Sequence, residues 1–180
     1  KCESPYAENK LEVEEFSKSI SHDATEIVCL RFFNVYGPGQ KGDSPYSSVI
    51  PIFIRALFDG QLTIHGDGSQ TRDFIHVQDV CRSILEIIKS ENIANRIINV
   101  GTGKRISILD LANLVINHGN ETRRELNASI QFSEKRKGDV SHSTAENSEL
   151  LNIIGDISFI EIEDGINQLV REIIPKGEKF

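Results

Sequence analysis

Methionine and tryptophan are both absent from this chain of 180 residues, and cysteine occurs only three times. Because three scattered cysteines cannot build a disulfide framework, they favour reduced thiols and a cytoplasmic protein. No apolar run approaches the roughly 20 residues needed to cross a bilayer, and no signal peptide is visible, so we expect no membrane attachment. A chain without methionine has no translation start as written, which predicts that it is the C-terminal half of a longer protein.

Basic residues are also fewer than acidic residues. The chain has 20 Lys and Arg against 27 Asp and Glu, which gives a formal net charge of −7. This balance argues against a nucleic-acid-binding surface. The hydrophobic share of 38% is ordinary for a soluble globular protein. We identify no metal site, so any bound phosphate would need fixed cationic side chains.

The letters SPYAENK at residues 4–10 predict the start of a helix. The serine suits an N-cap and the proline suits the first helical position. Val13, Phe16 and Ile20 then continue one apolar stripe along the helix.

Tyr6 and Lys10 are four residues apart on this helix and therefore share a face. A nearby ammonium group favours the phenolate and lowers the phenol pKa from its usual value near about 10. Such a phenol can take a proton from a hydroxyl group while hydride leaves the same carbon. The same spacing occurs by chance in many proteins, where both side chains are simply solvated, so the interpretation depends on the rest of the chain.

Four more motifs follow in order: LRFFNVYGP at 30–38, GDGSQTRDFIHV at 66–77, NVGTG at 99–103 and RKGDV at 136–140. With the SPYAENK segment, they make nearly the whole chain resemble the extended short-chain dehydrogenase/reductase family, and within it the NAD-dependent nucleotide-sugar epimerases and dehydratases. NVGTG is not a dinucleotide fingerprint, because Ile106 stands where a third glycine is needed.

The resemblance implies an α/β fold, made of the C-terminal part of a Rossmann-type NAD-binding domain and a small mixed α/β substrate-binding lobe. Residues 1–46 would end the Rossmann-type domain with the catalytic helix and the following strand. Residues 47–180 would form mainly the nucleotide-sugar lobe, with residues 72–100 partly returning to the first domain.

The patterns predict further elements along the chain. Helices are expected over 47–59, 77–90, from 108 onward after a Ser107 cap, 147–154 and 160–174. Gly60 would close the first of these, and the second would turn Val80, Ile84, Ile87 and Ile88 inward. Strands are expected over 26–33, 62–65, 72–75, 96–100 and 130–132. The strand at 26–33 is apolar almost throughout, which predicts cover on both faces.

The resemblance also implies roles for three residues in binding the NAD cofactor. Tyr6 would be the catalytic base and would contact the cofactor, while Lys10 would lower its pKa and hold the cofactor ribose. Phe33 would pack near the nicotinamide, with a simple core position as an equally good alternative.

On the substrate side, the resemblance places Asn34 against the nucleotide sugar, Ser48 and Val49 along its pocket, and His65 beside the base. Arg72 and Arg136 would hold the diphosphate, because guanidinium groups fork onto phosphate oxygens. Asp139 would accept from the ribose hydroxyls, and Ser143 would leave room for an acetamido group at C2 of the sugar. An alternative for Arg72 is an ion pair with Asp67 or Asp73, and His76 is expected to orient its turn structurally.

The expected function is therefore that of an NAD-dependent nucleotide-sugar 4-epimerase, acting on UDP-glucose and UDP-galactose or their N-acetylamino forms. This chain alone is expected to be inactive, and a homodimer is implied by the family. The alternatives are a dTDP-glucose 4,6-dehydratase-like enzyme, a non-catalytic nucleotide-sugar-binding protein and a purely structural interaction module.

Overall fold

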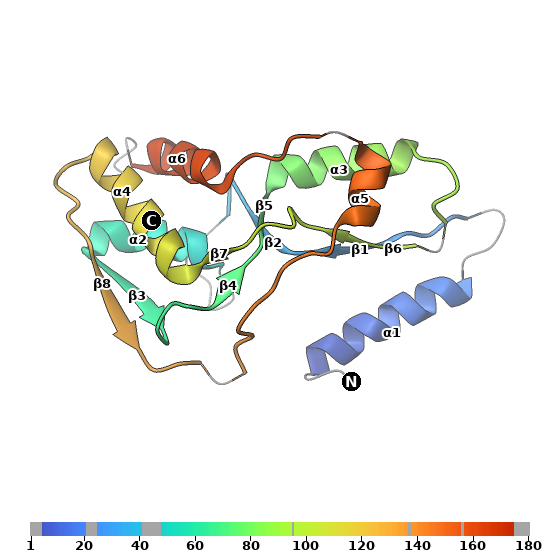
Figure 1. The fold of residues 1–180 in the computed structure, drawn as a ribbon, viewed down its shortest axis with the longest axis horizontal. Helices are drawn as coiled ribbons and strands as arrows, with labels where there is room; N and C mark the ends of the chain where they lie inside the picture. The colour runs from blue at the N-terminus through green and yellow to red at the C-terminus, as the bar shows by residue number, and fades with distance from the viewer. Residues whose placement is uncertain are drawn as a thin grey trace.

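The computed structural model describes residues 5–20, 25–40, 48–94, 96–136, 138–155 and 157–174, and it groups its elements around two apolar cores (Figure 1). The helices are α1 (Pro5–Ile20), α2 (Val49–Asp59), α3 (Val77–Lys89), α4 (Ile108–Thr122), α5 (Ser148–Ile154) and α6 (Ile162–Ile173). The strands are β1 (Cys29–Phe32), β2 (Asn34–Tyr36), β3 (Gln61–His65), β4 (Thr71–Arg72), β5 (Phe74–His76), β6 (Ile97–Val100), β7 (Ile106–Ser107) and β8 (Ser129–Ser133).

The first core lies where α2, α4 and α6 pack around the parallel strands β3 and β8. Helix α2 follows from its sequence, because Ile50, Phe53, Ile54 and Leu57 recur at helical spacing and are all buried. It ends at Gly60, whose φ of 74° is the left-handed conformation that glycine favours. The prediction of this helix is confirmed from residue 49, while its expected start at residue 47 lies outside the described residues.

The second core lies where α3 and α5 cover the parallel pair of β1 and β6. Ile98 and Val100 of β6 are completely buried there. The predicted helix at 77–90 is confirmed as α3, but Ile88 is 73% exposed and was wrongly expected to face inward. Val80 and Ile87 already occupy the buried stripe, and Ile88 is turned about 100° away from Ile87 around the helix.

Strands β2 and β5 form a two-stranded sheet that lies between the two cores. They pair in parallel, and alternate side chains point to opposite faces. Val35 and Ile75 therefore pack with the second core, whereas Tyr36 and Phe74 belong to the first. Asn34 begins this sheet, so it stands where the two groups of elements meet.

Most of the other expected elements are confirmed: α4, α5, α6, β3, β6 and β8. The strand expected at 72–75 is broken at Asp73 into β4 and β5, and β4 pairs antiparallel with β7. Searching the described residues finds no helix with the length and apolar character that a membrane span requires.

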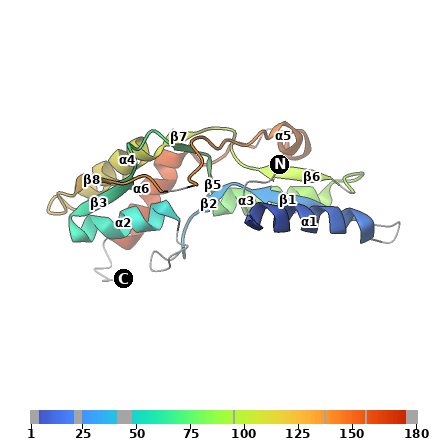
Figure 2. The ribbon, with the colours of Figure 1, turned by 90° about the horizontal axis from the view of Figure 1, so that it is seen from below.

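Helix α1 lies alongside β1, at the opposite end of the molecule from α4 (Figure 2). The helix itself is confirmed, and its apolar stripe is exposed, with Val13 at 60% and Phe16 at 63% exposure. Strand β1 is more open than predicted, with Phe32 50% exposed. The face that α1 turns toward β1 carries the buried Glu14.

Candidate functional site

The main cleft opens between α2, the strands β2 to β4 and the side chains of Arg136 and Asp139, with a volume of about 420 Å³. It collects seven side chains singled out from the sequence: Asn34, Ser48, Val49, His65, Arg72, Arg136 and Asp139. They come from segments up to 105 residues apart, counting from Asn34 to Asp139. The fold therefore brings together a polar, partly cationic rim over an apolar floor that includes Phe53 and Ile108.

Arg72 and Asp139 form an ion pair across this cleft, in which the Arg72 Nη2 group donates to the Asp139 carboxylate. Both side chains are mostly buried, at 16% and 26% exposure, and Arg72 Nη1 donates to the backbone oxygen of Thr71 at 2.8 Å. The alternative partners expected for Arg72, Asp67 and Asp73, are therefore wrong. A ligand bearing both phosphates and vicinal hydroxyl groups could engage the two partners, the cation with phosphate and the carboxylate with the hydroxyls.

Asn34 is fixed by two hydrogen bonds to one atom. Its backbone N–H and its side-chain Nδ2 donate to the carbonyl oxygen of Asp73, at 3.1 and 2.8 Å. The two bonds use both N–H-bearing groups of Asn34, and its side-chain oxygen can only act as an acceptor.

Asp73 itself is the largest omission from the sequence reasoning. Its side chain is completely buried and accepts hydrogen bonds from the N–H groups of Thr102, Gly103 and Ala145, each at 3.0 Å, and from the Thr102 hydroxyl at 2.7 Å. One carboxylate thus ties together the loop after β6 and the segment that carries Ser143. The signal available in the sequence was an acidic residue directly before the apolar pair Phe74 and Ile75 of β5, because an acidic side chain is rarely buried.

The NVGTG motif packs closely against the Asp73 carboxylate. A Cβ atom at Gly101 would lie 2.6 Å from the Ala145 Cβ and 3.0 Å from the Asp73 Oδ2. Only glycine allows the backbone to approach so closely. The expectation that this motif is a turn and not a dinucleotide fingerprint agrees with Ser107, which caps α4 by accepting from the Asp110 N–H at 3.0 Å.

His65 ends β3 at the rim of the main cleft. Its Nδ1 lies 2.8 Å from the Ser133 hydroxyl, and its backbone oxygen accepts from Gln70 Nε2 at 2.9 Å. These contacts orient the imidazole ring, so that Nε2 remains as the polar atom for a ligand.

A second cleft, the strand-end cleft, lies beyond the carboxyl ends of β1 and β6 and has a volume of about 600 Å³. Phe33, Asn34 and Ser143 all line it, so Asn34 is shared with the main cleft. Ser143 is held there by its backbone N–H, which donates to the Thr71 oxygen at 3.1 Å. Ligands of open α/β sheets bind at such strand ends.

A third cleft, the helix cleft, separates α1 from β1 and has a volume of about 660 Å³. Lys10 lines it together with Glu14 and Arg31. Tyr6 belongs to the first turn of α1, and its side chain lies outside the described part of the structure.

Histidine 76 has the structural role expected of it. His76 is completely buried, and its Nδ1 accepts from the Gln78 N–H at 3.2 Å as the N-cap of α3. Burial lowers the pKa of this imidazole. The ring packs edge-on against Tyr36, whose own pKa is raised by burial. Neither side chain lines one of the three clefts.

A model of the NAD dependent epimerase/dehydratase family matches residues 1–101. The dTDP-L-rhamnose 4-epimerase of Burkholderia thailandensis is 32% identical over 146 residues, which cover 81% of this chain and 39% of that protein.

Solved structures agree over a longer stretch. The UDP-N-acetylglucosamine 4-epimerase from Methanobrevibacter ruminantium, in complex with UDP-N-acetylmuramic acid, matches with a TM-score of 0.81 at 33% identity and covers 96% of this chain and 54% of that one. The UDP-glucuronic acid 4-epimerase from Bacillus cereus, in complex with UDP-glucuronic acid and NAD, matches with a TM-score of 0.79 at 28% identity and covers 97% and 54%. The chain spans about half the length of the curated relatives and solved structures that it matches.

Proposed function

The chain belongs to the NAD dependent epimerase/dehydratase family, and we propose that it supplies the catalytic helix and the nucleotide-sugar site of an NAD-dependent 4-epimerase. The substrates are UDP-glucose and UDP-galactose or their N-acetylamino forms. One observation carries the proposal: seven of the eight side chains expected to bind the nucleotide sugar line one cleft, and the eighth, Ser143, lines the adjoining cleft.

The main cleft suits a nucleoside diphosphate in charge and in shape. Arg72 and Arg136 supply fixed cations for the diphosphate, and Asp139 supplies an acceptor for ribose hydroxyls. His65 also lines the main cleft, where it would lie beside the base. Binding would exchange the ion pair between Arg72 and Asp139 for contacts of each group with the ligand.

The sugar then extends into the strand-end cleft, where Asn34 and Ser143 lie. The half-buried Ser143 is small enough to leave room for an acetamido group, which favours N-acetylamino sugars as substrates. A preference for UDP-glucose over UDP-N-acetylglucosamine of tenfold or more, about 1.4 kcal/mol, would count against this assignment.

The residues beside α1 fit one end of NAD. Lys10 in the helix cleft can donate to ribose hydroxyls, and Phe33 in the strand-end cleft offers a flat apolar face to the nicotinamide. Bound NAD supplies the acceptor for hydride from C4 of the sugar and the donor for re-reduction on the opposite face. Tyr6 accepts the proton of the C4 hydroxyl and later returns it, and Lys10 keeps the phenol pKa low enough for this exchange.

We further propose the arrangement of the complete protein. The second core, with α1, belongs to the Rossmann-type domain, and the first core forms the nucleotide-sugar lobe. The enzyme is a cytoplasmic homodimer that uses the exposed apolar stripe of α1, on which Val13, Phe16 and Ile20 are 60%, 63% and 46% exposed. Because the chain spans about half the length of its relatives, the isolated 180 residues are expected to show no turnover.

Calorimetric titration of the chain with UDP, dTDP, UDP-N-acetylglucosamine and NAD, each added separately, tests the proposal. We expect UDP and UDP-N-acetylglucosamine to bind without NAD, since the main cleft does not depend on the cofactor. Failure of both ligands to bind a chain that circular dichroism shows to be folded would refute the nucleotide-sugar site. Binding of dTDP alone would favour the dehydratase-like alternative, and epimerase turnover by the isolated chain would overturn the expected inactivity.

A further inference from the structure

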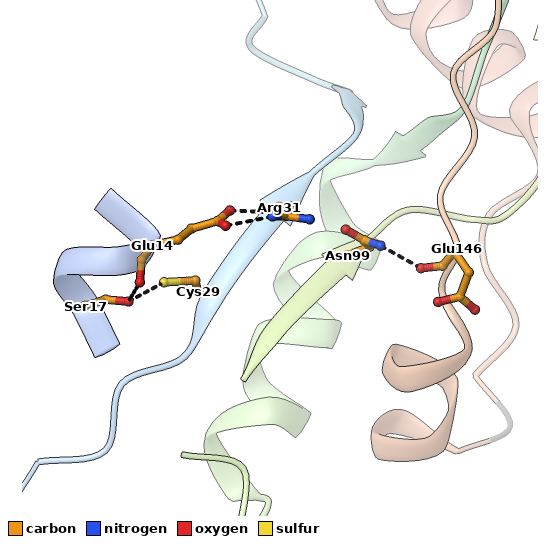
Figure 3. Close-up of polar contacts among 6 residues, drawn as sticks. All are labelled: Glu14, Ser17, Cys29, Arg31, Asn99 and Glu146. Carbon is orange, nitrogen blue, oxygen red and sulfur yellow. Dashed lines mark hydrogen bonds and ion pairs between the residues drawn. The ribbon is translucent and has the colours of Figure 1, made fainter. Parts of the chain in front are cut away.

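Helix α1 is held against β1 by polar contacts. Among its described side chains only Glu14 is buried, at 8% exposure. The Glu14 carboxylate accepts from Arg31 Nε and Nη2, both at 2.7 Å, in a bidentate pair (Figure 3). One turn further on, the Ser17 hydroxyl donates to the Glu14 carbonyl at 2.8 Å and lies 3.0 Å from the Cys29 sulfur.

The bidentate pair fixes the helix in two ways. Two parallel N–H···O bonds set both the separation of the groups and the angle between their planes, which a single point contact does not. The hydrogen bond from Arg31 lowers the pKa of Glu14, so the carboxylate stays ionised at neutral pH and the pair persists. Sliding α1 by one residue, about 1.5 Å, or turning it by about 100° would break both bonds.

Glu14 shares its face of the helix with the proposed catalytic residues. Lys10 lies four residues before it and Tyr6 four residues before that, so the three positions follow one another at one-turn intervals of about 6 Å. Lys10, Glu14 and Arg31 line the same helix cleft. Any rotation that releases Glu14 therefore also moves Lys10 and Tyr6.

Arg31 connects this helix to the substrate side. It lines the strand-end cleft as well as the helix cleft, and it precedes Asn34 by three residues on the same extended segment. Two of its three guanidinium nitrogens are used on Glu14, and in Figure 3 the third points toward Asn99, its register partner on β6. The guanidinium group of Arg31 therefore binds Glu14 of the helix and not a phosphate.

We propose that Glu14 and Arg31 are positioning residues, whose bidentate pair sets the register of α1 against β1 and so fixes Tyr6 and Lys10 relative to the sugar held at Asn34. This inference rests on the proposed function for its catalytic consequence, but the register itself can be measured without activity. A displacement of about 1 Å in a reacting group can cost roughly a hundredfold in rate, so a loosened helix is expected to affect catalysis strongly.

The first test is hydrogen exchange on the 180-residue chain. Glu14→Gln keeps the shape but removes the charge and one acceptor oxygen, and it should speed exchange of α1 amides at least tenfold while α2 and α4 keep their protection. The matched control is Glu15→Gln, the same change at the next and exposed position, which should leave α1 unchanged. Unchanged protection of α1 in Glu14→Gln would overturn the proposal, and so would a loss of protection spread equally over α1, α2 and α4.

The second test uses the whole enzyme that carries this chain. Glu14→Gln should lower kcat by about 10- to 100-fold with KM for the nucleotide sugar within about twofold, because Glu14 lines neither the main cleft nor the strand-end cleft. Arg31→Lys should lower kcat by a similar factor. The reversed pair, Glu14→Arg with Arg31→Glu, should recover at least a tenth of the wild-type kcat. A rise in KM at unchanged kcat, or no recovery in the reversed pair, would overturn the positioning role. A wild-type enzyme without epimerase activity would refute the proposed function, while the exchange result would still decide whether the pair holds α1.

Discussion

The buried carboxylate of Asp73 provides a quantitative test of how the site is built. It accepts four hydrogen bonds, two at Oδ1 from Thr102 and two at Oδ2 from Gly103 and Ala145. Asp73→Asn preserves the shape but replaces one acceptor oxygen with an NH₂ donor. Two of the four bonds are then lost, whichever way the amide is turned.

The size of the effect follows from the charge on the acceptor. Each hydrogen bond to a charged group contributes about 1.5 to 3 kcal/mol, so we expect the free energy of unfolding to fall by about 3 to 6 kcal/mol. That is a large share of the roughly 5 to 15 kcal/mol that stabilises a typical domain. Urea unfolding followed by circular dichroism at pH 7 gives this difference directly, through the midpoint and the m value.

A matched control is Asp67→Asn, because Asp67 also accepts two hydrogen bonds, from the Ser69 N–H and hydroxyl, but is exposed. Its unfolding midpoint should move much less than that of Asp73→Asn. A loss below about 1 kcal/mol in Asp73→Asn would refute the reasoning, since it would mean that the orphaned N–H groups find water at little cost.

Three further predictions concern the site and the cores. Arg72→Gln and Arg136→Gln should each weaken UDP binding at least tenfold, about 1.4 kcal/mol, and equal affinities in calorimetry would exclude them as phosphate ligands. Gly165→Ala should destabilise the chain by about 1 to 3 kcal/mol in urea unfolding, because the added Cβ would lie 2.2 Å from the Tyr36 hydroxyl in a buried site. Since burial lowers the pKa of His76 from 6.5, the unfolded chain takes up the proton first, so stability should be full above about pH 6.5 and fall as the pH drops. His76→Asn, which keeps a capping side chain, should show a smaller loss between pH 7 and 5; an identical loss would assign the pH dependence to other groups.

Local elements could be predicted from the sequence where the signal is itself local. Helix α2 has its apolar residues at helical spacing and a glycine directly after its end, and both features were read correctly. The cap of α4 was likewise identified, because Ser107 stands directly before an apolar periodic run. Such signals depend on neighbours within about one turn of helix.

Contacts between distant residues could not be predicted in this way. Arg72 and Asp139 are 67 positions apart, and periodicity says nothing about which carboxylate will meet a given guanidinium. The motifs did assign both residues to the same ligand, so their joint presence in the main cleft agrees with that expectation, while their direct pairing is new information from the structure. The hydrogen bonds to the Asp73 carboxylate were missed for the same reason, because their donors lie 29 to 72 positions away along the chain.

Helix α1 shows why a helix can be predicted from the sequence while the face that it turns toward its neighbours cannot. An apolar stripe indicates which face prefers to be covered, but not by what, and here Val13 and Phe16 are 60% and 63% exposed. The inner face instead carries Glu14, whose burial is tolerated only because Arg31 meets it with two hydrogen bonds. Apolar contacts would allow the helix to slide, whereas a buried carboxylate is stable in one register alone. The placement of α1 is therefore determined by its most polar contact, which leaves its apolar face available to a second surface.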